Sequence, residues 1–315
     1  MLVRISRNYS FPNLARQTPK MSFVWDGIEF TEEEVDNADF LIILNQPAED
    51  IKCKVREGGV WLMMQEPPAE KNEYFRYHFR FVDRVYSDFK VEGKPNFQEQ
   101  TGLPWHIGKS YDELIELDLD DLPKKKDKVS WITSTNNMFK GHEKRLNFID
   151  FLKKENFDFD LYGRGFNPID DKFDGIAPYK YSIAVENYFS RNYWTEKAID
   201  AWLSWSVPIY YGCTNMNDFF PKNSFIQVDL DNPKRSLEII QDAIKNNFFE
   251  NHIQEISEAR LRILNEYQLF PSLKRRIDEF IAEGNGSKFK NYRIPKSGLT
   301  KAESIKKGIR NKFKI

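Results

Sequence analysis

The chain has 315 residues, 40% of them hydrophobic, and its 47 Lys and Arg nearly balance its 48 Asp and Glu. This length suits two domains of ordinary size, and the net charge of −1 gives no reason to expect nucleic acid as a partner. Two cysteines without metal-ligand spacing, no run of about 18 apolar residues and no signal-peptide core predict a cytoplasmic protein without a transmembrane helix.

The first 122 residues alternate apolar runs with polar connections. The runs predict strands, and the helical patterns between them predict short helices at residues 49–57 and 74–81. The predicted strands cover residues 1–7, 38–47, 60–66 and 82–89. Strands that alternate with helices at this spacing indicate a Rossmann-like half.

Glu66 ends one of these strands and is followed by Pro67 and Pro68. Proline cannot extend a ladder and restricts the residue before it, so the carboxylate is expected at a fixed turn. A fixed carboxylate at a strand end suits a general base that accepts a proton from a hydroxyl group. From spacing alone, a glutamate that only caps the turn is the simpler alternative.

Residues 118–128 are rich in charge and contain one proline, which is typical of a linker. They predict a boundary between an N-terminal domain, residues 1–122, and a C-terminal domain, residues 123–284. Residues 285–315 would then form a basic tail.

A second strand-to-helix junction lies just after this linker. Ser134, Thr135 and Asn136 end a predicted strand, and Arg145 lies in the helix that follows. Hydroxyl, amide and guanidinium groups at such a junction make a good phosphate cradle, because a guanidinium can hold two phosphate oxygens at once. A surface cation that lies along its own helix is the alternative for Arg145.

Residues 181–229 predict a strand, a polar loop, a helix and a second strand, which is one unit of a parallel sheet. Thr195 is a good N-cap for the helix. The helix has its apolar residues at helical spacing, namely Ala198, Ala201, Trp202 and Trp205.

Ligands of such sheets bind beyond the carboxyl ends of the strands, where helix N-termini favour anions. The predicted strand delivers Glu186 and Asn187 to this edge, and Glu196 and Lys197 open the helix. A carboxylate suits the hydroxyls of a ribose, and the lysine suits a phosphate. The pattern indicates a nucleotide or nucleotide-sugar site, with two ordinary surface residues as the alternative for Glu196 and Lys197.

These motifs resemble the donor-binding signature of the α-1,3/4-fucosyltransferases, glycosyltransferase family 10, in its bacterial type. The segment Trp61 to Pro68 is similar to the family's general-base motif, with a one-residue contraction and Pro in place of Ser. The donor motifs follow in the family's order as Tyr179-Lys180, Glu186-Asn187, Thr195-Glu196-Lys197, Val207-Pro208-Ile209, Asp218-Phe219-Phe220-Pro221 and Ser224 to Val228.

The resemblance implies an α/β GT-B fold, with two Rossmann-like domains facing across a cleft. It implies inverting transfer of L-fucose from GDP-fucose to a glycan hydroxyl in α-1,3/4 linkage, with no cofactor and no obligate metal. Glu66 would be the catalytic base. The donor would be bound by Arg145, Glu186, Asn187, Glu196, Lys197, Ser134, Thr135, Asn136 and Tyr193.

Two alternatives remain open: a GT-B transferase that uses another GDP-sugar, and a non-catalytic module that binds glycans or nucleotides. The expected acceptors are surface glycans such as lipopolysaccharide, or glycosylated protein. Residues 286–315 contain ten Lys or Arg and one Glu. A basic amphipathic helix at 301–315 would suit peripheral contact with an anionic membrane, and a solvated tail is the alternative.

Overall fold

The computed structural model describes residues 1–67, 70–137 and 140–297, and the chain divides into two compact units. Unit 1 comprises residues 1–15, residues 22–102 and the described residues from 269 onward. Unit 2 comprises residues 16–21 and 103–268. The helix predicted at 301–315 lies outside the described residues.

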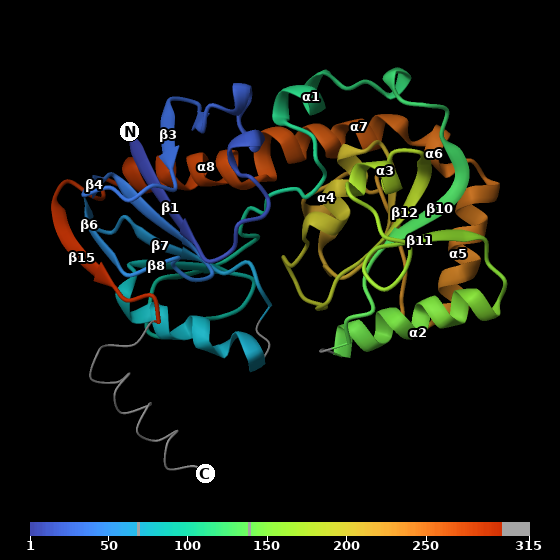
Figure 1. The fold of residues 1–315 in the computed structure, drawn as a ribbon, viewed down its shortest axis with the longest axis horizontal. Coiled ribbons are helices and arrows are strands. Elements are labelled where there is room, and N and C mark those ends of the chain that lie inside the picture. Colours follow the sequence, from blue (N-terminus) through green and yellow to red (C-terminus); the bar gives the residue numbers. More distant parts are fainter. Residues whose placement is uncertain (68–69, 138–139, 298–315) are drawn as a thin grey trace, which may run out of the picture. The chain divides into compact units, whose positions relative to one another are not determined.

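Unit 1 is built on a seven-stranded sheet in the order β2-β3-β1-β5-β7-β8-β9 (Figure 1). All neighbours pair in parallel except β2 and β3, so the carboxyl ends of β1, β5, β7 and β8 lie at one edge. The strands are β1 (Leu2–Arg7), β2 (Val24–Trp25), β3 (Ile28–Thr31), β5 (Phe40–Leu44), β7 (Val60–Met63), β8 (Arg84–Ser87) and β9 (Asn96–Gln98).

The central strands of unit 1 are buried on both faces, as expected for a parallel sheet. On β5, Phe40 and Ile42 pack in one core with the helix α8 (Leu269–Ala282). Leu41 points to the other face and packs in a second core with the 3-10 helix η3 (Glu70–Phe81) and a small sheet. The predicted strands at 1–7, 38–47, 60–66 and 82–89 are confirmed as β1, β5, β7 and β8.

Unit 1 also contains a small sheet in the order β15-β6-β4. Its strands are β4 (Asn37–Ala38), β6 (Ile51–Arg56) and β15 (Phe289–Ile294). Two predictions made from the sequence are wrong in this region. The helix predicted at 49–57 is wrong, because the alternation of buried Ile51, Cys53 and Val55 with exposed lysines has the period of a strand. The tail predicted from 285 is also wrong over residues 289–294, because β15 pairs antiparallel with β6.

Unit 2 is built on a five-stranded parallel sheet in the order β11-β10-β12-β13-β14. Its strands are β10 (Lys126–Ile132), β11 (Phe159–Tyr162), β12 (Tyr179–Val185), β13 (Val207–Tyr211) and β14 (Ile226–Gln227). The helices α3 (Lys172–Ile176) and α4 (Glu196–Leu203) cover one face, and α7 (Ile253–Arg262) packs on α4. The helices α2 (Lys140–Lys154) and α5 (Pro233–Lys245) pack beside each other on the other face (Figure 1).

The division into units also corrects the predicted domain boundary at 122. Residues 118–128 lie within unit 2, where Asp118 and Asp121 cap one 3-10 turn, η4 (Leu119–Asp121). The chain passes between the units at residues 15–16, 21–22, 102–103 and 268–269. The last crossing lies at the start of α8, because the apolar face of that helix packs on the sheet of unit 1. The remaining short helices are η1 (Ala15–Gln17), η2 (Pro19–Met21), α1 (Tyr111–Glu116), η5 (Met216–Asp218), α6 (Phe248–Asn251) and the π-helix η6 (Ile263–Tyr267).

Candidate functional site

The carboxyl edge of the unit 2 sheet gathers most of the predicted donor-binding residues. The strands β10, β12 and β13 run in parallel, so the loops that follow them leave from the same edge. Ser134, Thr135 and Asn136 follow β10, whereas Glu186 and Asn187 follow β12. Hydrogen bonds from α2 join these two loops, and hydrogen bonds from the N-terminus of α4 hold Glu186.

Arg145 of α2 joins the first two of these loops. Its Nη2 donates to the carbonyl oxygens of Ser134 (3.0 Å) and Asn136 (2.9 Å), and its Nη1 donates to Oδ1 of Asn187 (3.1 Å). Gly141 permits the approach, because a Cβ at this position would lie 2.0 Å from the carbonyl oxygen of Asn187. The helix, the β10 loop and the end of β12 are thereby held in one arrangement.

The guanidinium of Arg145 is buried without a counter-ion. The residue is 5% exposed, its Nε has no hydrogen-bond partner, and no carboxylate forms an ion pair with it among residues 1–67, 70–137 and 140–297. Burial lowers the pKa of Arg145, as expected for a cation taken out of water. An uncompensated buried charge is costly, so this position favours an anion.

Glu186 has the opposite character, because its carboxylate is fully buried and fully engaged. The backbone N–H of Thr195 donates to Oε1 at 2.7 Å, and the Thr195 hydroxyl donates to Oε2 at 2.7 Å. Lys197 Nζ approaches Oε2 to 3.2 Å. Gly212 leaves room for this side chain, since a Cβ there would lie 2.4 Å from Cγ of Glu186. Glu186 therefore fixes the N-terminus of α4 and orients Lys197.

An alternating chain of charges continues from Glu186 along α4. Lys197 Nζ lies 3.3 Å from Oε1 of Glu196, and Lys172 Nζ lies 3.8 Å from the same oxygen. Lys172 also pairs with Oδ2 of the buried Asp200 at 2.8 Å. This row of five side chains thus alternates in sign. Its three carboxylates and two ammonium groups have a formal net charge of −1. Lys197 and Lys172 each lie beside two carboxylates, whereas Arg145 has no carboxylate partner among the described residues.

The pKa shifts of Glu186, Glu196 and Lys197 follow from burial, which is opposed by the charges of neighbouring side chains. Burial raises the pKa of Glu186, against the pull of Lys197. Burial would also raise the pKa of Glu196, but Lys197, His106 and Lys172 outweigh it and hold that pKa well below its usual range. Burial would lower the pKa of Lys197, but its two carboxylate partners raise it instead. Glu196 and Lys197 are therefore a charged pair at neutral pH.

Sequence reasoning missed Lys172, His106 and Asp200. Asp200 Oδ1 accepts the backbone N–H of His106 at 2.7 Å, which ties the segment after Trp105 to α4. No pattern in the sequence pointed to them, because they come from three separate segments. The remaining predicted residues lie on the same edge: Tyr193 is buried with its ring edge-on to Tyr188, Ser134 is half-buried, and Thr135 and Asn136 are exposed.

Glu66 lies in unit 1, just after β7, at the carboxyl edge of that sheet. Its side chain is exposed and its backbone is held, because Oδ1 of Asn45 accepts the N–H groups of Gln65 (2.7 Å) and Glu66 (3.2 Å). Asn45 itself follows β5 in a left-handed conformation (φ 59°) that asparagine tolerates well. The carboxylate is thus presented to solvent from a rigid loop.

The described residues contain no group of three or more His, Cys, Asp and Glu side chains that could hold a metal ion. Over the same part of the chain, no helix is both long enough and apolar enough to cross a membrane.

Residues 122–248 match the family described as Glycosyltransferase family 10 (fucosyltransferase), C-terminal part. The mouse 4-galactosyl-N-acetylglucosaminide 3-alpha-L-fucosyltransferase 9 is 29% identical over 133 residues, which cover 40% of this chain and 36% of that protein. The chain therefore spans about a third of the length of the curated relatives it matches.

Two solved structures resemble the whole fold. A crystal structure of an alpha1,3-fucosyltransferase matches with a TM-score of 0.51 at 16% identity, over 91% of this chain and 90% of that chain. An alpha-glucosyltransferase solved with UDP matches with a TM-score of 0.54 at 9% identity, over 89% of this chain and 99% of that chain.

These likenesses confirm the GT-B fold, in which one chain forms two Rossmann-like units. The resemblance to the family 10 fucosyltransferases is confirmed as well, for the part of the chain that carries the donor motifs. Every predicted donor-binding residue, from Ser134 to Lys197, falls within residues 122–248. Glu66 lies outside that match, so its assignment rests on the sequence motif and on its position after β7.

Proposed function

We propose that the chain is an inverting fucosyltransferase that transfers L-fucose from GDP-fucose to a glycan hydroxyl in α-1,3/4 linkage. The family match over residues 122–248 supports the reaction and the donor. The geometry supports a pyrophosphate-bearing donor, because the carboxyl edge of the unit 2 sheet combines a cation with a carboxylate suited to sugar hydroxyls.

The single observation that carries the proposal is the buried guanidinium of Arg145, which has no counter-ion among the described residues. A diphosphate would supply the negative charge that this cation lacks, and the Nε–H, which has no partner in the described part of the chain, is a donor for it. The Ser134–Asn136 loop and Asn187 hold this guanidinium in place, so little reorganisation would be needed on binding. Arg145 is therefore the principal diphosphate ligand in our proposal.

The α4 end of the site would hold the sugar part of the nucleotide. Glu196 would accept hydrogen bonds from ribose hydroxyls, since its pKa is held low and it remains a carboxylate. Lys197 would donate to a phosphate oxygen while Glu186 keeps it oriented. Tyr193 and Asn187 would line the same edge. Arg145 and Lys197, rather than an obligate metal, would neutralise the leaving diphosphate.

Glu66 would act as the general base in this reaction. The acceptor oxygen attacks the anomeric carbon of fucose as Glu66 takes the hydroxyl proton, and the bond from that carbon to the β-phosphate oxygen breaks. The electron pair of that bond leaves on GDP. Attack on the face opposite the leaving group inverts the anomeric centre. The support for this role is an exposed carboxylate on a loop whose backbone is fixed.

The proposal is tested by supplying the protein with GDP-fucose, GDP-mannose and UDP-sugars and measuring nucleotide release with a panel of glycan acceptors. The expected result is GDP release from GDP-fucose that depends on the acceptor, with the product linkage read by NMR. Release of GDP from another GDP-sugar, but not from GDP-fucose, would identify that other GDP-sugar as the donor. GDP binding without turnover on any acceptor would leave a binding module and overturn the transferase.

The acceptor we propose is a surface glycan such as lipopolysaccharide. The basic composition of residues 286–315, with ten Lys or Arg, supports peripheral contact with an anionic membrane where such acceptors are assembled. Co-sedimentation with vesicles that contain phosphatidylserine tests this contact. Equal binding after removal of residues 298–315 would contradict it.

A further inference from the structure

A second concave surface lies in unit 1, on the outer face of the β15-β6-β4 sheet. It encloses about 430 Å³. Its lining includes three cations and two amides from the three strands, with one carboxylate beside them: Lys52, Lys54, Arg293, Asn37, Asn291 and Asp36. All six residues are exposed. None belongs to the donor site, which lies in unit 2.

The register of the strands brings these side chains together. Arg293 lies directly opposite Lys52, and Asn291 lies directly opposite Lys54. Asn37 lies on the other side of Lys54, across the β4–β6 pair. Residues two apart on a strand share a face, and directly opposed residues have Cβ atoms about 4.5–5.5 Å apart. The three cations and two amides therefore form one compact polar surface.

The three cations of this surface lack counter-ions. Lys52, Lys54 and Arg293 make no ion pair with any carboxylate of the described residues, and the amides of Asn37 and Asn291 make no side-chain hydrogen bond there. Like charges directly opposed across strands are destabilising, as for Arg293 and Lys52. The one carboxylate of the lining, Asp36, cannot balance three cations.

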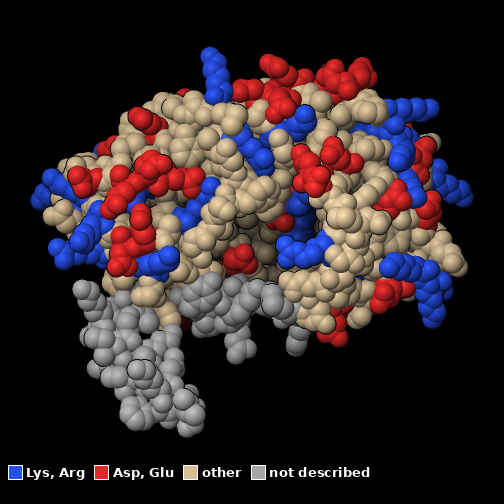
Figure 2. Space-filling view, in the orientation of Figure 1, with Lys and Arg blue, Asp and Glu red and all other residues tan. Residues whose placement is uncertain are grey.

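Two other basic residues on the same strands behave differently. Arg56 pairs with Asp39 at 3.0 Å, and Lys290 lies 3.7 Å from both Glu57 and Asp83. Basic residues near β6 and β15 can be seen at the margin of Figure 2, with acidic residues beside them. The strands therefore pair some of their cations internally and leave the outer face unpaired.

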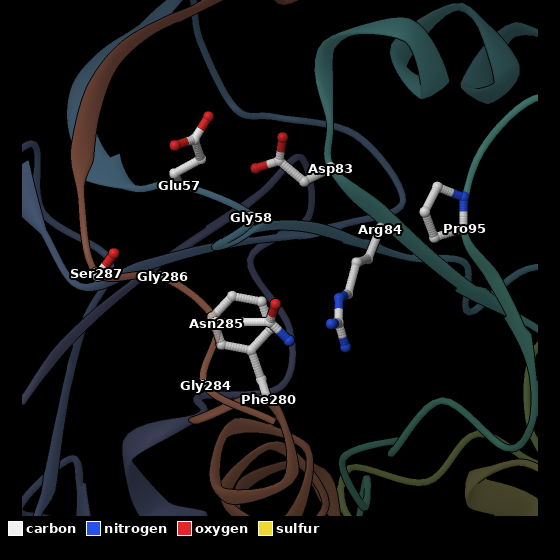
Figure 3. A pocket seen from close by; sticks show the side chains of 10 residues that line it. All are labelled: Glu57, Gly58, Asp83, Arg84, Pro95, Phe280, Gly284, Asn285, Gly286 and Ser287. Carbon is white, nitrogen blue, oxygen red and sulfur yellow. The ribbon is translucent and has the colours of Figure 1, made fainter. Parts of the chain in front are cut away.

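The pocket in Figure 3, of about 370 Å³, gives a contrast within the same unit. There the carboxylates of Glu57 and Asp83 lie on one side and the Arg84 guanidinium on the other. Each of these charged groups has a partner. Arg84 pairs with Glu283 at 3.1 Å, Asp83 accepts the Tyr292 hydroxyl at 2.5 Å, and Lys290 lies 3.7 Å from Glu57. The charged groups of that pocket therefore have partners, whereas the three cations on the outer face of the small sheet have no ion pair with the described residues.

We propose that the outer face of the β15-β6-β4 sheet binds an acidic oligosaccharide. Lys52, Lys54 and Arg293 would hold its carboxylate or phosphate groups by charge-assisted hydrogen bonds. Asn37 and Asn291 would donate to and accept from its hydroxyls, since an amide does both. A concave surface with amides suits a discrete sugar chain better than a flat bilayer. Binding here does not depend on the proposed transferase activity.

The test titrates the full chain with a hexamer of galacturonate and with maltohexaose, its uncharged counterpart, by calorimetry at low and high salt. The native protein should bind the acidic hexamer only, and more weakly at high salt. The double substitution Lys52→Ser/Arg293→Ser should weaken binding by about tenfold or more, because two charge-assisted contacts are lost. Lys245→Ser removes an exposed lysine of α5 in unit 2 that has no ion pair with the described residues, and this variant should bind as the native protein does.

Thermal unfolding of the same variants gives a second readout. Relief of the cross-strand repulsion should leave the melting temperature of Lys52→Ser/Arg293→Ser equal to or above that of the native protein. A clearly lower melting temperature would contradict the unrelieved repulsion. Equal affinity for both hexamers, or no binding to either, would overturn the proposal. The cations would then be explained by a role in preventing edge-to-edge association of sheets. Binding to phosphatidylserine vesicles but not to the hexamer would overturn the proposal in favour of a membrane.

Discussion

The carboxyl edges of the two large sheets differ in whether their charged side chains are buried or exposed. In unit 2, Glu186 is buried with both oxygens bound, and the guanidinium of Arg145 is buried without a carboxylate among the described residues. In unit 1, the side chain of Glu66 is exposed, and Asn45 accepts its backbone N–H. The first edge therefore buries a cation that suits an anionic ligand, and the second presents a carboxylate to solvent.

The difference suggests that binding and chemistry have separate structural requirements. A bound anion gains most from donors that are already oriented in a water-poor place, because no reorganisation is needed when it arrives. A general base must instead reach a proton on an incoming hydroxyl, so it needs access and a defined position. Substitutions at the two edges should therefore fail in different ways, and three experiments examine whether they do. A fourth examines a buried cation away from both edges.

The largest effect is expected at Glu66. Glu66→Gln keeps the size of the side chain and removes its basicity, so fucosyl transfer should fall by about 100- to 10,000-fold. GDP affinity should stay near the native value, because the proposed donor site lies in unit 2. The measurement is initial rate against acceptor concentration, with calorimetry for GDP.

Glu29→Gln is the matched control for this substitution. Glu29 is an exposed glutamate on β3 of the same sheet, and its replacement should leave the rate unchanged. Loss of GDP binding in Glu66→Gln would show that the two edges do not have separate roles.

Glu186→Gln should cost stability rather than rate alone. The amide cannot balance Lys197, and its NH₂ group would face the Lys197 ammonium or the Thr195 donors. Breaking a buried ion pair from one side typically costs about 3–5 kcal/mol, so the free energy of unfolding should fall by about 3 kcal/mol in urea titrations. Glu238→Gln removes an exposed partner of Arg235 and should change it by less than about 0.5 kcal/mol. Equal losses in both variants would contradict the network described for Glu186.

A smaller effect, on the pH dependence of stability, is expected at Lys125, whose ammonium group is buried among backbone carbonyl groups. Its Nζ donates to the carbonyl oxygens of Ala177, Tyr179 and Ser204, and burial lowers its pKa to about 7. The unfolded chain keeps this proton up to about pH 10, so between pH 7 and 10 unfolding takes up a proton and stability rises with pH.

This contribution can be isolated by comparing the native protein with Lys125→Met. The difference in unfolding free energy between the two should shift in favour of the native protein by about 2–2.5 kcal/mol from pH 7.5 to 9.5. A difference that stays constant over that range would mean that Lys125 keeps its charge in the folded protein.

Much of the unit 2 site could be predicted because its signals are local. The apolar spacing of Ala198, Ala201 and Trp202 defines α4, and Thr195 caps it as expected. The carboxyl ends of parallel strands meet by geometry, so Arg145 and Asn187 could be expected to lie close together, and their hydrogen bond is found.

The missed features depend on distant partners. The strand β15 has mostly exposed side chains, and only its pairing with β6 makes it a strand. Lys172 lies in a polar segment with no pattern of its own, yet it completes the charge chain through Glu196 and Asp200. The misassigned β6 is different, because the alternation of Ile51, Cys53 and Val55 was visible in the sequence.

The central claim is that Arg145 is the principal diphosphate ligand, and calorimetry of GDP and guanosine tests it most directly. The native protein should prefer GDP by about 100-fold or more, since a guanidinium and a second cation both face the phosphates. Arg145→Met should reduce that preference to about tenfold or less. Its ligand-free melting temperature is measured beside it, because the substitution also removes the three hydrogen bonds that Arg145 makes within the fold. An unchanged preference for GDP in Arg145→Met would contradict the claim.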